Sequence, residues 1–68
     1  MKLTNNDKLL ASCALRRGDH FVRNNVLLFM IDPGEYCVQK MDGPVTAENR
    51  VITRSWTEAL NSFEIFCG

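Results

Sequence analysis

The sequence predicts a small single domain of the α+β class, with an N-terminal helix, an antiparallel meander of three or four strands and a C-terminal helix. Three observations lead to this prediction. A capped polar segment opens the chain, four short β-rich stretches follow with turn residues between them, and a segment with helical spacing closes it. Because the connections between the expected strands are short, neighbouring strands must run antiparallel. The expected order over residues 1–68 is therefore α-β-β-β-β-α.

The first helix is expected over residues 5–17. Thr4 or Asn6 can cap its start, and Gly18 can adopt the left-handed conformation that ends it. Leu15 lies off the apolar stripe of this helix, so it is either exposed or covered by another segment. The stripe itself has helical spacing and is expected to face the core. It consists of Leu9, Leu10, Cys13 and Ala14.

Four strands are expected after this helix, separated by residues typical of turns. Asn24 and Asn25 can adopt the positive φ angles of a two-residue hairpin. Pro33 and Gly34 are typical of a tight turn, because proline presets φ and glycine permits a positive φ. The first strand is so short that its formation stays open. The expected strands are residues 20–23, 26–31, 36–41 and 50–55.

The C-terminal helix has the most regular apolar pattern in the chain. Ser55 and Glu58 match the S-x-x-E capping box that precedes it. Its other face is mostly polar, with Ile65 as the exception. The apolar stripe consists of Trp56, Ala59, Leu60, Phe63, Phe66 and Cys67.

Composition narrows the classes of function. Eight Lys and Arg balance eight Asp and Glu, so the net charge is zero and there is no basic excess of the kind that nucleic-acid binding uses. The longest apolar run has six residues, far short of a membrane-spanning helix. The N-terminus lacks the apolar core of a secretory signal. We therefore expect a cytoplasmic protein with no membrane partner.

The residues that usually carry chemistry do not form a recognisable pattern. Cys13, Cys37, Cys67 and His20 are a ligand set that zinc would accept, but they lack knuckle spacing and come from four separate elements. An odd number of separated cysteines favours reduced thiols in a reducing compartment. No glycine-rich phosphate loop is present. We expect no enzymatic activity, metal, cofactor or small-molecule substrate.

The strand expected over residues 26–31 bears most directly on function, because every position in it is apolar. Such a strand should be buried on both faces. The two helices can cover opposite faces of the sheet, or both can lie on one face and leave the other for a partner. An uncovered face would show Val26, Leu28 and Met30, or Leu27, Phe29 and Ile31. The candidate interface residues are Leu28, Phe29, Met30 and Leu15.

A second possible surface is basic. Arg50, Ile52 and Arg54 alternate onto one face of the last strand, and Lys40 and Arg23 could join them. Such a sheet face could contact nucleic acid, as sheet readers do. Charges on a solvated sheet edge that discourage unwanted strand pairing are the alternative explanation.

Two hypotheses of function follow. The first is a non-enzymatic regulator or inhibitor that binds a larger protein stoichiometrically, with a homodimer as a further form of the same interface. By analogy, tiny proteins without cofactor sites are frequent among phage and mobile-element accessory factors that block host machinery or defence. The second is a small nucleic-acid-binding regulator that uses Arg23, Lys40, Arg50 and Arg54.

Overall fold

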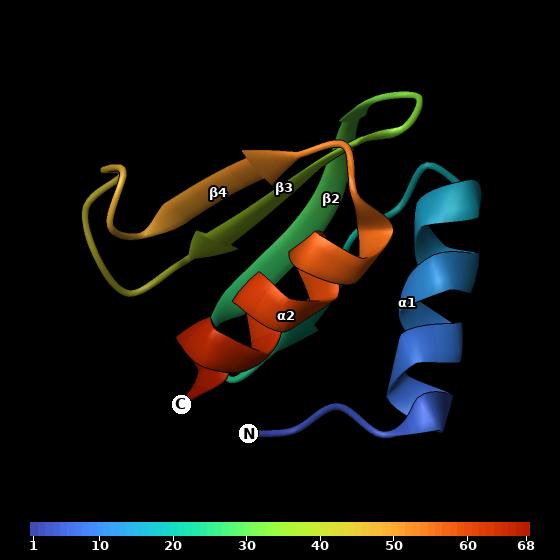
Figure 1. The fold of residues 1–68 in the computed structure, drawn as a ribbon, viewed down its shortest axis with the longest axis horizontal. Helices are drawn as coiled ribbons and strands as arrows, with labels where there is room; N and C mark the ends of the chain where they lie inside the picture. The colour runs from blue at the N-terminus through green and yellow to red at the C-terminus, as the bar shows by residue number, and fades with distance from the viewer.

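The computed structural model describes residues 1–68 and confirms the α+β class and the element order α-β-β-β-β-α (Figure 1). All four strands form, including the short first one, and each pairs antiparallel with the next along the chain. The elements are α1 (Asn5–Arg16), β1 (Phe21–Arg23), β2 (Val26–Asp32), β3 (Glu35–Lys40), β4 (Arg50–Thr53) and α2 (Trp56–Cys67).

The two tight turns of the sheet form where the sequence predicts them. Asn24 and Asn25 have φ angles of 49° and 61°, the left-handed values of a two-residue hairpin that matches the twist of its strands. Gly34, with φ of 79°, follows Pro33 in the turn between β2 and β3. Close to this second turn the register shifts between Met30 and Asp32.

The helix starts are capped, but in two different ways. At α1 the Thr4 hydroxyl accepts a hydrogen bond from the Asp7 backbone N–H, and the Asp7 carboxylate accepts one from the Thr4 N–H. At α2 the Ser55 hydroxyl accepts from the Glu58 N–H at 3.2 Å. The Ser55 N–H donates to the Thr53 hydroxyl at 3.1 Å instead of to Glu58, so only half of the predicted capping box forms.

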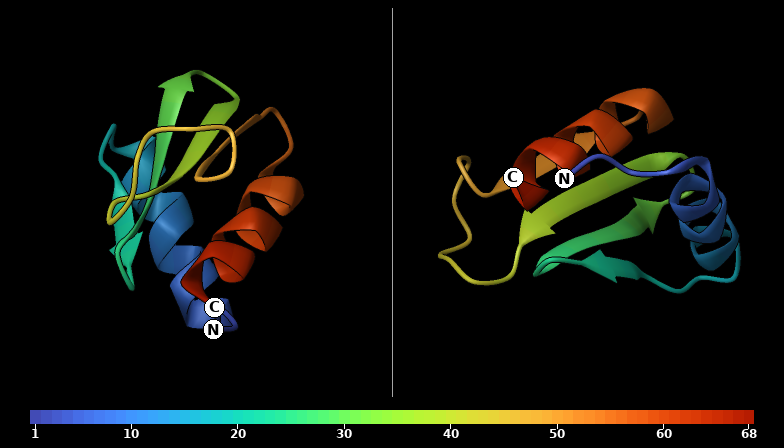
Figure 2. Two further views of the ribbon diagram at one scale, coloured as in Figure 1. Left: turned by 90° about the vertical axis from the view of Figure 1, so that its left-hand side faces the viewer. Right: turned by 90° about the horizontal axis from the view of Figure 1, so that it is seen from below.

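Both helices lie on the same side of the sheet, which decides the alternative that the sequence leaves open. The two further views show α2 over the sheet with α1 beside it, and no helix on the other side (Figure 2). The contacts agree, since α2 packs on β2, β3 and β4 while α1 packs on β1 and β2. Between the helices and the sheet lies the core, whose largest fully buried side chains are Phe63, Leu28, Val26 and Val38.

The stripe predicted for α1 is correct at Ala14 and wrong at Leu9 and Leu10. Ala11, Ala14 and Leu15 are its buried residues, whereas Leu9 is 61% and Leu10 46% exposed. Both sets of residues have helical spacing, so periodicity alone does not choose between them. The helix packs on β1 and β2, and the small side chains of Ala11 and Ala14 face the core there. The larger Leu9 and Leu10 are left facing solvent.

Candidate functional site

The side of the sheet opposite both helices is the candidate site, and we call it the open face. Because side chains alternate along a strand, each strand sends every second residue to this face. The strand register arranges them in two cross-strand rows. One row is Val22, Leu27, Gln39 and Arg50, and the other is Phe29, Cys37 and Ile52.

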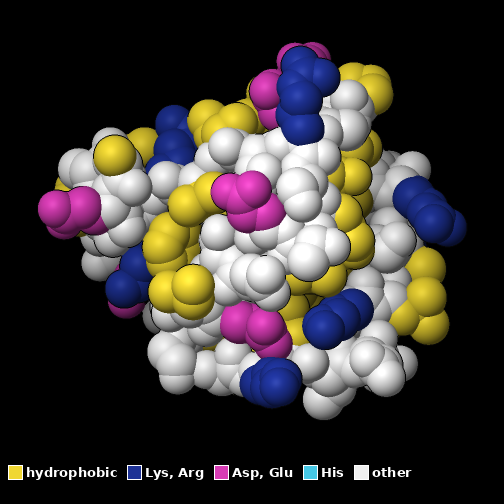
Figure 3. Space-filling view, viewed as in Figure 1, with side chains coloured by type: hydrophobic (Ala, Val, Ile, Leu, Met, Phe, Trp, Pro, Cys, Tyr) yellow, Lys and Arg dark blue, Asp and Glu magenta, His cyan; other side chains and the backbone are white.

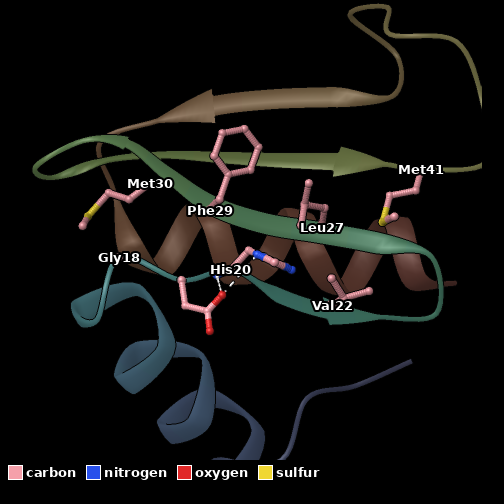
Figure 4. A pocket seen from close by; sticks show the side chains of 8 residues that line it. Gly18, His20, Val22, Leu27, Phe29, Met30 and Met41 are labelled. Atoms are coloured by element: carbon pink, nitrogen blue, oxygen red, sulfur yellow. Dashed lines mark hydrogen bonds and ion pairs between the residues drawn. The ribbon is translucent and has the colours of Figure 1, made fainter.

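The open face is mainly apolar around the first hairpin. Val22, Leu27 and Phe29 are half-buried, and Met41, just beyond β3, is 53% exposed. In Figure 4 these side chains lie on the face of the sheet away from α2. Together with the loop after α1 they border a hollow of about 480 Å³. The far end of β2 adds Met30 to its lining.

One polar pair lies at the rim of this hollow. The Asp19 carboxylate accepts a hydrogen bond from the His20 backbone N–H at 2.8 Å, and its Oδ1 lies 3.2 Å from Nδ1 of the His20 ring. This local pair holds the imidazole beside the apolar floor, with the His20 side chain still 61% exposed (Figure 4). An apolar floor with a polar pair at its rim suits an apolar group that has a polar neighbour.

On the open face a thiol lies beneath a guanidinium group. Cys37 has no exposed surface although it points to the uncovered side of the sheet, and Nε of Arg50 lies 3.4 Å from its sulfur. Phe29 and Ile52 are its cross-strand neighbours. The small cysteine is therefore buried beneath longer side chains, and it is these side chains that a partner would meet.

Of the four predicted interface residues, Phe29 and Met30 border the hollow, and Leu28 and Leu15 do not. Phe29 lies on the open face, whereas Leu28 has no exposed surface and Leu15 is only 3% exposed. Met30 lies on the helix side in register with Tyr36, half-buried at the margin of the sheet. Leu28 and Leu15 are therefore core residues, and the expectation that they could face a partner is corrected. For Leu28 the reason is alternation, because neighbouring positions of β2 point to opposite faces. Leu15 lies instead on the buried side of α1.

Several residues of the open face were not among the predicted interface set. Leu27 belongs to the second of the two alternatives that the sequence allows, and Val22 and Ile52 are placed beside it only by strand pairing. Leu27 lies two positions before Phe29 in β2, so the two side chains point to the same face. Leu27 could therefore have been predicted as soon as Phe29 was known to lie on the uncovered face. No pattern in the sequence points to Met41, which follows the end of β3.

The four basic residues of the second hypothesis do not share a face. Arg50 lies opposite Gln39 on the open face, so the adjacent Lys40 points to the helix side. Arg23 lies over the Phe21 ring, with 4.6 Å between the guanidinium carbon and the ring centroid, and also lies near Asp7. Arg54 lies beside Glu35. On the face that carries the helices, Lys and Arg are interspersed with Asp and Glu (Figure 3).

The structure gathers no metal-binding group. No cluster of three or more His, Cys, Asp or Glu side chains is placed to hold an ion, and Cys13, Cys37 and Cys67 are free thiols. Burial raises the pKa of the Cys67 thiol, which keeps it protonated and a poor ligand. Neither helix has the length and apolar content needed to cross a bilayer.

Comparisons with known proteins do not assign a family to this chain: no protein-family model, no curated protein and no solved structure matched it.

Proposed function

We propose that this protein is a non-enzymatic regulator or inhibitor that binds a larger protein stoichiometrically through the open face. One observation carries the proposal: the apolar side chains Val22, Leu27 and Phe29 lie on the side of the sheet that neither helix covers. Contiguous apolar surface with a polar border is typical of interaction sites on small proteins.

The shape of the open face supports contact with a folded or partly folded protein surface. The hollow of about 480 Å³ is large enough to receive one or two apolar side chains of a partner. His20 and Asp19 at one rim and Arg50 and Gln39 across the sheet supply polar groups around it. An apolar centre with a polar border excludes water from the central contacts and lets a few residues carry most of the binding energy.

The hypothesis extends to a biological role. A stoichiometric binder of this size acts by occupying a surface of its target, as phage and mobile-element accessory factors do when they block host machinery or defence. This extension rests on analogy with other tiny proteins and requires identification of the target.

A charge placed at the hollow tests the proposal. Met41→Glu alters a side chain that is 53% exposed, so the fold should persist while an apolar partner surface is repelled. Ile65→Glu is the matched control, because Ile65 is 75% exposed on α2 and lies outside the open face. Tagged wild-type protein and both variants are used to capture partners from the native host. The captured protein is then purified, and its stoichiometry with the wild-type chain is measured by native mass spectrometry.

The expected result is one defined complex with wild-type protein and Ile65→Glu, and at least about tenfold weaker binding with Met41→Glu. Circular dichroism confirms that both variants are folded. Equal binding by Met41→Glu and wild type would reject the open face as the site. Binding of DNA or RNA that falls steeply with salt would instead favour a nucleic-acid regulator.

A further inference from the structure

The two edges of the sheet differ in whether their backbone groups are protected. An exposed edge strand carries unpaired N–H and C=O groups that can pair with another strand, and proteins usually block such edges. The edges here are β1 and β4.

The β1 edge is blocked by a side chain of its own strand. Arg23 and Val26 directly flank the two-residue turn and form a hydrogen-bonded pair, so the backbone groups of Val22 point away from β2. Nη1 of Arg23 donates a hydrogen bond to this outward Val22 carbonyl at 2.9 Å. A further strand added at β1 would have to displace that contact.

No side chain forms a hydrogen bond with the outward backbone groups of the β4 edge. The Lys40 N–H donates to the Asn49 carbonyl at 2.9 Å, so the backbone N–H and C=O groups of Asn49 point toward β3. These backbone groups alternate in direction along an antiparallel strand, so those of Arg50 and Ile52 point outward. None of the side-chain, turn or loop hydrogen bonds of the protein reaches these outward groups. The strand is regular in its pairing with β3 and contains no proline.

We propose that β4 pairs antiparallel with β4 of a second copy of this chain, with the two-fold axis passing at Val51. In this register Arg50 lies opposite Ile52 of the second copy, and the outward groups of both residues can form four N–H to C=O hydrogen bonds across the axis. The sheets of the two copies become one continuous sheet. The proposal is independent of the proposed function, because it uses the edge of β4 and not the hollow on the open face.

The extent of β4 selects this register over its neighbours. With Val51 at the axis, both outward residues, Arg50 and Ile52, pair within the strand, which spans only Arg50–Thr53. A shift that centres the pairing on Ile52 would leave Arg50 with no strand residue opposite it. A shift that centres it on Arg50 would place the two Arg50 residues side by side. Like charges on directly opposed positions are destabilising.

The side chains at the edge also fit this pairing. Ile52 is 52% exposed on the open face, and in the dimer the aliphatic part of Arg50 from the second copy covers it. On the helix side Val51, which is half-buried in the single chain, meets Val51 of the second copy at a non-hydrogen-bonded pair. Such pairs bring side chains closest together, and β-branched residues pack well there.

Sedimentation equilibrium over about 1 to 100 μM protein tests the pairing. Wild type is expected to sediment with twice the mass of the chain at the upper concentrations. Ile52→Pro removes an outward N–H that β3 does not use, so a folded monomer is expected. A wild-type monomer throughout, or a dimer unaffected by Ile52→Pro, would refute the proposal.

Cysteine cross-linking gives a second readout that needs no proline. In a chain with Cys13 and Cys67 replaced by serine and Cys37 by alanine, so that no native thiol lies opposite residue 52, Val51→Cys places two thiols at the axis, within the reach of a disulfide. Ile52→Cys is the matched control, since its two copies lie offset along the strands and too far apart to bridge. Cross-linking of Val51→Cys but not Ile52→Cys is the expected outcome, and the reverse would overturn the register. Met41→Glu should leave the dimer intact, which separates this test from that of the open face.

Discussion

Replacing Leu28 and, in a separate variant, Leu27 with alanine tests which face of the sheet the helices cover. The two residues are chemically identical neighbours in β2 and point to opposite sides. Leu28 has no exposed surface and packs among the core residues, whereas Leu27 is half-buried at the hollow of the open face. The pair therefore differs in environment alone.

The expected magnitudes differ by severalfold. Truncating a fully buried leucine removes its transfer free energy and leaves a cavity, at about 3 kcal/mol. Leu27 loses only part of a contact surface that water already reaches, so its truncation should cost about 1 kcal/mol. A domain of 68 residues has a free energy of unfolding of only about 3–10 kcal/mol. Leu28→Ala should therefore remove a third of the stability or more.

Urea unfolding measures the difference. Far-UV circular dichroism and the fluorescence of Trp56, whose ring lies 5.2 Å from that of Tyr36, report on the helices and on the core beneath α2. With a slope of about 1 kcal/mol per molar urea, the midpoints of the two variants should differ by about 2 M. Equal midpoints would mean that both faces of β2 are covered. A lower midpoint for Leu27→Ala would mean that the helices pack on the other face.

Further predictions concern the helix cap, the first hairpin and the thiols. Thr4 lowers the pKa of the Asp7 carboxyl, chiefly because the Thr4 backbone N–H donates a hydrogen bond to it. The ionised Asp7 therefore stabilises the fold at pH values above the ordinary pKa of aspartate. This stabilisation is lost as the pH falls through the lowered pKa. The stability difference between wild type and Asp7→Asn should therefore vanish in acid, and a difference that persists there would contradict the cap. Thr4→Ala should cost about 1 kcal/mol in thermal or urea unfolding at neutral pH. Asn25→Gly should raise the melting temperature, because glycine adopts the positive φ at this position without strain; a lower melting temperature would argue against the hairpin geometry. Mapping of alkylated thiols by mass spectrometry should find Cys37 unreactive until the protein unfolds, and Cys67, whose pKa is raised by burial, slower than a free thiol at neutral pH.

Local chemistry made most of the fold predictable. The Asn24-Asn25 and Pro33-Gly34 turns act on their own backbone, and the Thr4 and Ser55 caps act within one helical turn, so their effects do not depend on distant residues. Where local rules offered two solutions, the prediction was wrong. The predicted stripe and the observed stripe of Ala11, Ala14 and Leu15 both have helical spacing, and only the packing of α1 on β1 and β2 selects the second.

The candidate site was predictable only in part, for a related reason. An apolar strand indicates that both of its faces avoid water, but it does not say which face the chain itself covers. Phe29 was identified together with Leu28, although alternation forces the two to opposite sides. The basic set failed in the same way, since Lys40 and Arg50 lie on strands whose register turns them apart.

The class, the order of the elements, the two tight turns and the apolar character of β2 could be predicted from the sequence, because each depends on residues close in the chain. The packing of both helices on one side, the place of Leu28 and Leu15 in the core, and the uncovered face shared by Val22, Leu27 and Phe29 became known from the three-dimensional structure. These outcomes depend on strand register and on where each helix lies against the sheet. Both are set by contacts between residues far apart in the chain, which no local pattern encodes.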